Sequence, residues 1–229
     1  MTGGTDGILI VDKPSGMTSH DVVDFIRRTF RIKKAGHAGT LDPMATGVLV
    51  ILLGRYTRES ARLSGEDKEY AATMVLGAVS DTGDREGRIT RSGPPPDYSL
   101  ADIENVFRDF TGEISQLPPM YSALKIKGKK MYELARKGVV VERSPRRVFI
   151  KSLNVTDFKA PYVGFEVTCT KGTYIRQLCA DIGAKLGCGA YLNALRRTRS
   201  GAFGIQDAVS LDRLKVAGLS ELEKVVLKI

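Results

Sequence analysis

The sequence of 229 residues contains no tryptophan, two histidines and three cysteines. The cysteines, Cys169, Cys179 and Cys188, are odd in number, and the chain has neither a Cys-x2-Cys nor a His-x3-His pair. Those spacings are typical of metal sites. We therefore expect no metal, and we expect the cysteines to be reduced, mostly packed thiols in a reducing compartment.

Long apolar runs are also absent. The longest spans residues 48–53, whereas a membrane-spanning helix needs about 20 apolar residues. Residues 1–12 show no basic segment followed by a long apolar run, so no signal peptide is expected. These features predict a cytoplasmic protein that does not bind a membrane.

Acidic residues are outnumbered by basic ones, giving a formal net charge of +9 and a sequence pI of about 9.5. The excess is concentrated, because residues 125–151 hold ten Lys or Arg and two Glu, and residues 171–199 hold six Lys or Arg and one Asp. Such groups suit a phosphate backbone, although a solvated basic face is the alternative. Four tyrosines lie in or beside these blocks and could stack on unpaired bases: Tyr121, Tyr132, Tyr174 and Tyr191. No zinc-finger spacing or basic-helix dimer pattern is present, so RNA is favoured over DNA.

Hydrophobic periodicity and turn residues predict strands and helices without a regular βαβ rhythm. The expected strands are residues 7–12, 48–53, 70–76, 147–158 and 162–170. Four helices are expected. The first begins at Thr18 or Ser19 and ends at Phe30, and the others run from Ser99 to Phe110, from Met131 to Lys137 and from Tyr174 to Leu186. Further helical signals lie in a tail over 210–229. Residues 113–130 are expected to be irregular. The pattern predicts an α+β fold with a mixed, mainly antiparallel sheet, in a single domain spanning residues 1–229.

Residues 36–47 form a glycine-bracketed stretch that contains His37, Asp42 and Pro43. Proline disfavours the α region at the preceding residue, so Asp42 is held extended at a stiff bend. A carboxylate presented in this way could be a nucleophile, a general base, a metal ligand or a helix cap, or the segment could be a plain turn. No Lys lies between Gly36 and Gly47, which argues against a phosphate-binding loop of the Walker type.

Six stretches together resemble the motifs of one family, in the family's order. They are residues 13–19, 36–43, 68–71, 116–125, 172–176 and 195–197. The chain resembles bacterial TruB-type tRNA pseudouridine-55 synthases from about residue 6 to about residue 215, which implies a pseudouridine-synthase-like fold. Bacterial members usually carry a small C-terminal RNA-binding domain similar to the PUA domain. This chain stops at Ile229, so no PUA-like domain is expected.

The resemblance also implies roles for individual residues. Asp42 is the essential carboxylate, which adds to the base or the sugar carbon, or removes a sugar proton. Arg176 is the cation that keeps Asp42 ionised, and Tyr70 stacks on the target base. His37 contacts the RNA around the flipped nucleotide, and Tyr174 and Leu195 line the uridine pocket. Lys13 supports the catalytic loop. Without the resemblance, the pattern favours an ordinary surface arginine at 176 and a strand-start aromatic at 70.

The implied substrate is the T stem-loop of tRNA, and the implied reaction needs no cofactor. Six cations are candidate contacts to RNA phosphates: Lys125, Lys127, Lys129, Arg196, Arg197 and Arg199. We expect a monomer. Two alternatives stay open: a non-catalytic RNA-folding protein on the same scaffold, and a related synthase that acts on ribosomal RNA.

Overall fold

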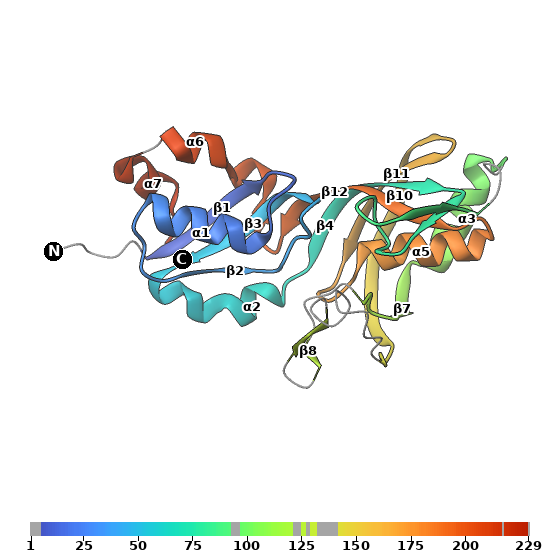
Figure 1. Ribbon diagram of the computed structural model, residues 1–229, viewed down its shortest axis with the longest axis horizontal. Coiled ribbons are helices and arrows are strands. Elements are labelled where there is room, and N and C mark those ends of the chain that lie inside the picture. The colour runs from blue at the N-terminus through green and yellow to red at the C-terminus, as the bar shows by residue number, and fades with distance from the viewer. Residues whose placement is uncertain are drawn as a thin grey trace. The chain divides into compact units, whose positions relative to one another are not determined.

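The computed structural model describes residues 6–92, 97–120, 125–126, 129–131, 142–216 and 218–228. It contains two compact units, which we call the first unit (residues 1–70 and 195–229) and the second unit (residues 71–194). Figure 1 shows the elements of both. The chain passes between the units within strand β4 (Lys68–Leu76) and again within strand β12 (Ala190–Ser200).

The first unit is built on a mixed sheet. Its further elements are β1 (Gly7–Lys13), α1 (Ser19–Thr29), β2 (Ala35–Ala38), β3 (Thr46–Leu53), η1 (Gly54–Glu59), α2 (Ser60–Ser64), β13 (Phe203–Gly204), η2 (Ile205–Asp207), β14 (Val209–Ser210), α6 (Leu211–Val216) and α7 (Leu219–Val225). Strand β1 is antiparallel to β3 and parallel to β14. Strand β2 is antiparallel to β3, and the C-terminal part of β12 is parallel to β3.

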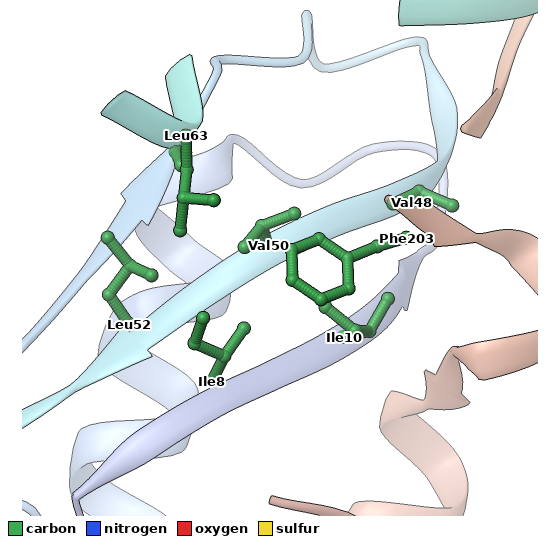
Figure 2. Packing of buried hydrophobic residues seen from close by; sticks show 8 residues of the cluster. Ile8, Ile10, Val48, Val50, Leu52, Leu63 and Phe203 are labelled. Atoms are coloured by element: carbon green, nitrogen blue, oxygen red, sulfur yellow. The ribbon is translucent and has the colours of Figure 1, made fainter. Parts of the chain in front are cut away.

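Both faces of the β1–β3 pair are buried. One face carries a hydrophobic cluster, which Figure 2 shows with Leu63 of α2 packed over the strands. The members are Ile8, Ile10, Ala38, Val48, Val50, Leu52, Leu63 and Phe203. The alternate residues of the same strands point to the opposite face and are buried too: Leu9, Val11, Leu49, Ile51 and Leu53. This doubly covered sheet is a rigid base for the loop that joins β2 to β3.

The second unit combines an antiparallel sheet with two helices. Its further elements are β5 (Ala78–Ser80), β6 (Ile89–Arg91), α3 (Leu100–Asp109), β7 (Gly112–Gln116), β8 (Lys125–Ile126), β9 (Lys129–Lys130), β10 (Arg146–Lys159), β11 (Tyr162–Cys169) and α5 (Ile175–Leu186). Strand β10 lies between β7 and β11 and is antiparallel to both. The rings of Phe107 in α3 and Phe165 in β11 pack edge to face, which joins α3 to the sheet.

Local sequence signals predicted many of these elements. Thr18 caps α1 and Ser99 caps α3, each in a capping box that Asp21 and Asp102 complete. Helix α5 ends at Gly187, which adopts the left-handed conformation. The predicted inward residues of β11, which are Val163, Phe165, Val167 and Cys169, are all buried. The α+β class with a mixed, mainly antiparallel sheet is confirmed.

Three parts of the secondary-structure prediction fail or stay open. The sequence pattern predicted no strand at β2, β5, β6, β12, β13 or β14. It expected residues 113–130 to be irregular, but β7, β8 and β9 lie there. The predicted helix at residues 131–137, like Tyr121 and Tyr132, lies almost wholly outside the described residues. In the described part of the chain, no helix is long and apolar enough to cross a membrane.

Candidate active site

Asp42 lies in the loop of residues 39–45, which connects β2 to β3 in the first unit. The side chain is half-buried. The backbone carbonyl of Asp42 accepts a hydrogen bond of 3.0 Å from the Ala45 amide, which closes a tight turn around Pro43. The turn predicted from the sequence therefore exists, and it places Asp42 at a partly buried position.

Lys13, at the end of β1, supports this loop through hydrogen bonds to backbone carbonyls. Its side chain is 0% exposed. The ammonium group donates to the backbone carbonyls of Pro14, Met17 and Pro43, at 2.9, 2.6 and 3.1 Å. A buried ammonium needs such acceptors because desolvation of a charge is expensive. The prediction that Lys13 supports the loop is confirmed.

Two serines of the same N-terminal segment add further contacts to the loop. Ser19 Oγ accepts from the Leu41 amide at 2.8 Å and donates to the Leu41 carbonyl at 3.1 Å. Ser15 Oγ donates to the Met44 carbonyl at 3.2 Å. Sequence analysis weighed Ser19 only as a helix cap, whereas Thr18 takes that position. Residues 13–19 therefore act as a support for the Asp42 loop, with contacts on both sides of Asp42.

Arg197 was predicted to contact an RNA phosphate, but it is a buried residue that holds the Asp42 loop. The residue is 1% exposed, so its charge is not presented to a polyanion at the surface. Its Nε donates to the Val48 carbonyl at 2.7 Å, Nη2 donates to the Gly39 carbonyl at 2.9 Å, and Nη1 lies 3.5 Å from the Thr40 carbonyl. The prediction failed because residues 190–200 were not recognised as a strand that buries alternate side chains.

The other predicted phosphate contacts have mixed outcomes. Arg196 is half-exposed and forms a two-pronged ion pair with Asp12, at 3.1 and 2.7 Å. Arg199 lies 3.5 Å from Glu69 in a more open ion pair. Lys125 and Lys129 have described backbone in β8 and β9, their side chains are outside the described part, and Lys127 is outside it altogether. These five cations stay predictions.

In the second unit, Arg176 projects from the first turn of α5 and is buried. Its Nη1 lies 3.3 Å from Asp84 Oδ2, with each side chain 6% exposed, and donates to the Thr82 carbonyl at 2.9 Å. The alternative of an ordinary surface arginine is therefore wrong. The sequence did not predict Asp84 as the partner of Arg176. The one feature that could have indicated it is the position of an acidic residue within the polar turn of residues 80–87. The Asp84 carboxylate also accepts from Thr82 Oγ1 at 2.7 Å.

Tyr174 is the N-cap residue of α5, and Gln116 of β7 fixes its backbone. The Tyr174 amide donates to Gln116 Oε1 at 2.9 Å, and Gln116 Nε2 donates to the Tyr174 carbonyl at 3.2 Å. These bonds satisfy one orphan donor at the helix start and set where α5 begins. Arg176, two positions further on, is thereby fixed along the helix axis as well.

The remaining predicted site residues belong to the first unit. Tyr70 in β4 and Leu195 in β12 are largely buried. His37 in β2 is held through its carbonyl, which accepts from Ser60 Oγ at 3.2 Å, and no described residue hydrogen-bonds to its buried Nδ1. Burial first, then the nearby charges of Arg197 and His20, lower the pKa of His37 below its usual range. The imidazole therefore stays neutral to a lower pH than that of a free histidine.

The site residues are divided between the two units. Asp42, Tyr70, His37 and Leu195 belong to the first unit, with Lys13 and Arg197 supporting them. Tyr174 and Arg176 belong to the second unit. The pairing of Asp42 with Arg176 stays a prediction. Within the described ranges, no group of three or more His, Cys, Asp or Glu residues could hold a metal ion.

Two family models match the chain over nearly its whole length. Residues 27–175 match the N-terminal domain of TruB family pseudouridylate synthases, and residues 176–228 match the C-terminal domain of tRNA pseudouridylate synthase B. The tRNA pseudouridine synthase B of Syntrophotalea carbinolica is 49% identical over 98% of this chain and 73% of its own length. The enzyme of that name from Opitutus terrae is 47% identical over 96% of this chain and 91% of its own.

A solved structure gives the same result for the fold. A chain of a Cbf5-Nop10-Gar1 complex is 33% identical with a TM-score of 0.77, and the match covers 96% of this chain and 59% of that one. A chain of an H/ACA RNP bound to a substrate RNA is 32% identical with a TM-score of 0.69, over 91% of this chain and 52% of that one. The predicted pseudouridine-synthase-like fold is confirmed. The chain belongs to the TruB family of pseudouridylate synthases.

Proposed function

We propose that this chain is an isomerase that converts the T-loop uridine at position 55 of tRNA to pseudouridine, with Asp42 as the essential carboxylate. The observation that carries the proposal is the support of the Asp42 loop. Side chains of Lys13, Ser19 and Arg197 bond to its backbone, and Asp42 itself is only partly buried. A loop held in this way positions a reacting group instead of filling a core.

The reaction rearranges one nucleoside without a redox step or a group donor. The bond from the sugar C1′ to uracil N1 breaks, the base turns, and a bond from C1′ to C5 forms. The proton on C5 is lost and N1 gains one, so the atoms balance. Asp42 adds to the base or to the sugar, or it removes a sugar proton. A fixed carboxylate close to the sugar gains from the rate advantage of correct orientation.

The other residues receive supporting roles in this proposal. Arg176 keeps Asp42 ionised, because a guanidinium opposes the rise in pKa that burial of a carboxylate causes. Tyr70 stacks on the target base, and Tyr174 and Leu195 line its pocket. His37 contacts the RNA near the extruded nucleotide. Extrusion costs a few kcal/mol, which these contacts and the cations along the RNA must offset.

The test is incubation of the protein with unmodified tRNA, followed by mapping of pseudouridine at nucleotide resolution. The proposal predicts modification at position 55 and none in the same tRNA with cytidine at that position. A protein that binds and refolds the tRNA without modifying it would be the non-catalytic alternative. Modification of a ribosomal RNA fragment in place of tRNA would favour the other synthase alternative.

A further inference from the structure

We propose that Arg197 is a positioning residue for Asp42, because its guanidinium fastens the two ends of the 39–45 loop to each other. The kinetic consequence rests on the proposed function, whereas the structural role does not. The sequence analysis expected this arginine to contact phosphate, and its burial excludes that role. The question is therefore why a charged side chain is kept inside the first unit.

The pairing of strands explains how Arg197 reaches the loop. Strand β1 covers one edge of β3 along residues 47–53, so β2 and β12 must share the other edge. Strand β2 pairs with residues 50–53 of β3, and β12 pairs with residues 46–47. The loop leaves β2 after Ala38, which lies opposite Val50, and enters β3 at Thr46, which lies opposite Arg196. Arg197, opposite Gly47 in the register, is thus placed at the opening of the loop.

The three acceptors lie on both sides of the loop. Gly39 and Thr40 are its first residues, and Val48 lies in β3 just after it ends. One planar group therefore joins the outgoing and the returning chain. An ammonium carries its donors on a single nitrogen, whereas a guanidinium spreads five donors over three nitrogens in a rigid plane. A lysine at this position would keep the charge, but its single nitrogen could not occupy the places of Nε, Nη1 and Nη2 together.

Burial of this charge is costly, and none of the ion pairs formed by the described residues includes Arg197. The cost of desolvation is met by carbonyl dipoles alone. Apolar side chains of similar volume can replace a buried ion pair without loss of stability, but Arg197 donates to backbone carbonyls, and its removal would take these donors from Gly39 and Val48. The contacts of this arginine are therefore with the backbone that sets the position of the loop.

The backbone supports the same reading. Gly47 has φ +97°, and a Cβ there would overlap the backbone of Arg197. Gly39 also has a positive φ, +83°, but a Cβ there would be only in ordinary van der Waals contact with Arg197 Nη1, at 3.4 Å. Gly47, two residues after the loop, thus lets the Arg197 backbone approach closely, and Gly39 lets the loop take its left-handed conformation. The absence of a side chain at Gly47 therefore allows β12 to lie close enough for Arg197 to reach the loop.

The experiment compares Arg197→Lys and Arg197→Met with Arg62→Met, a matched change at an exposed arginine of α2 that pairs only with Glu59 at the surface. Hydrogen exchange of residues 39–48 is measured in the RNA-free proteins, with β1 as the internal reference for global stability. Single-turnover rates and tRNA dissociation constants follow. We expect faster exchange in 39–48 but not in β1, and a rate lower by ~10–100-fold, because a displacement of about 1 Å can cost that much. The dissociation constant should be unchanged, and Arg62→Met should match the unaltered protein.

The outcomes separate this proposal from the proposed function. Unchanged exchange in residues 39–48 of Arg197→Lys would overturn the positioning role, as would an unchanged rate. A weaker tRNA affinity with an unchanged rate would return Arg197 to the phosphate contacts. If Arg197→Met does not fold, Arg197→Lys decides, since it keeps charge and nearly the same length. If the unaltered protein forms no pseudouridine, the proposed function fails, while the exchange data still decide the role of Arg197.

Discussion

Replacement of Asp84 by asparagine is expected to destabilise the protein strongly, although the two side chains have nearly the same shape. Asp84 Oδ1 accepts from Thr82 Oγ1 at 2.7 Å and from the Glu86 amide at 3.0 Å, and Oδ2 faces Arg176 Nη1 at 3.3 Å. The amide oxygen of asparagine can keep the first two bonds. Its NH2 group would then face the guanidinium, donor against donor.

The burial of the pair sets the size of the effect. Both side chains are 6% exposed, so solvent does little to screen the attraction between them. Removing one partner of a buried ion pair costs about 3–5 kcal/mol. At roughly 2–4 °C for each kcal/mol in a chain of this size, the melting temperature should fall by about 6–20 °C.

The assay is thermal unfolding followed by circular dichroism, with Asp81→Asn as the control. Asp81 lies in the same turn, is exposed and accepts from the Arg88 amide at 2.8 Å. Asparagine can accept that bond, so the control should change the unfolding free energy by less than ~0.5 kcal/mol. An Asp84→Asn protein within about 1 kcal/mol of the unaltered one would refute the reasoning, because it would show that the pair contributes no more than a surface one.

Three further predictions concern single positions. Burial lowers the pKa of His37. Its contribution to stability is therefore full above the unfolded pKa of about 6.5 and is lost as the pH falls toward the lower folded pKa. His37→Gln should flatten the dependence of the unfolding free energy on acid pH, and an identical slope in the two proteins would contradict this. Burial raises the pKa of the Cys179 thiol. Alkylation of the native protein should therefore label Cys188, which is partly exposed, and leave Cys179 unlabelled. Equal labelling of the two thiols would contradict the burial of Cys179 in α5. Gly47→Ala should lower the unfolding free energy by at least about 2 kcal/mol, because the new Cβ meets the Arg197 backbone in addition to the strain of a left-handed conformation. Gly187→Ala, at φ +79° with no atom near its Cβ, should lower it by only about 1–2 kcal/mol. Equal unfolding midpoints for the two variants would argue against the close approach of β12 to Gly47.

Elements whose signals are local were predictable from the sequence. The capping boxes at Thr18 and Ser99 involve residues three positions apart, and Gly187 ends α5 through its own backbone conformation. The bend at Asp42 follows from the proline beside it. The same holds for the strand alternation of β11, which needs only its own eight residues. Local physics was enough in these cases.

Features that depend on distant partners were not predictable in this way. Strand β12 contains consecutive arginines, of which Arg196 reaches solvent and Arg197 is buried. Arg197 is held by carbonyls from the loop near residue 40 and from Val48 of β3, both far from it in the sequence. Asp84 was missed for a similar reason, since only folding brings it to Arg176. A charge count can find a basic segment, but it cannot tell which charge the protein uses internally.

The most direct test of the central claim is single-turnover pseudouridine formation by Asp42→Asn, measured beside its affinity for unmodified tRNA. The amide keeps the size of the side chain and removes its charge and basicity, and the loop contacts of Lys13 and Arg197 go to the backbone and should persist. We predict tRNA binding as tight as that of the unaltered protein and no pseudouridine. A near-normal rate of pseudouridine formation would contradict the account.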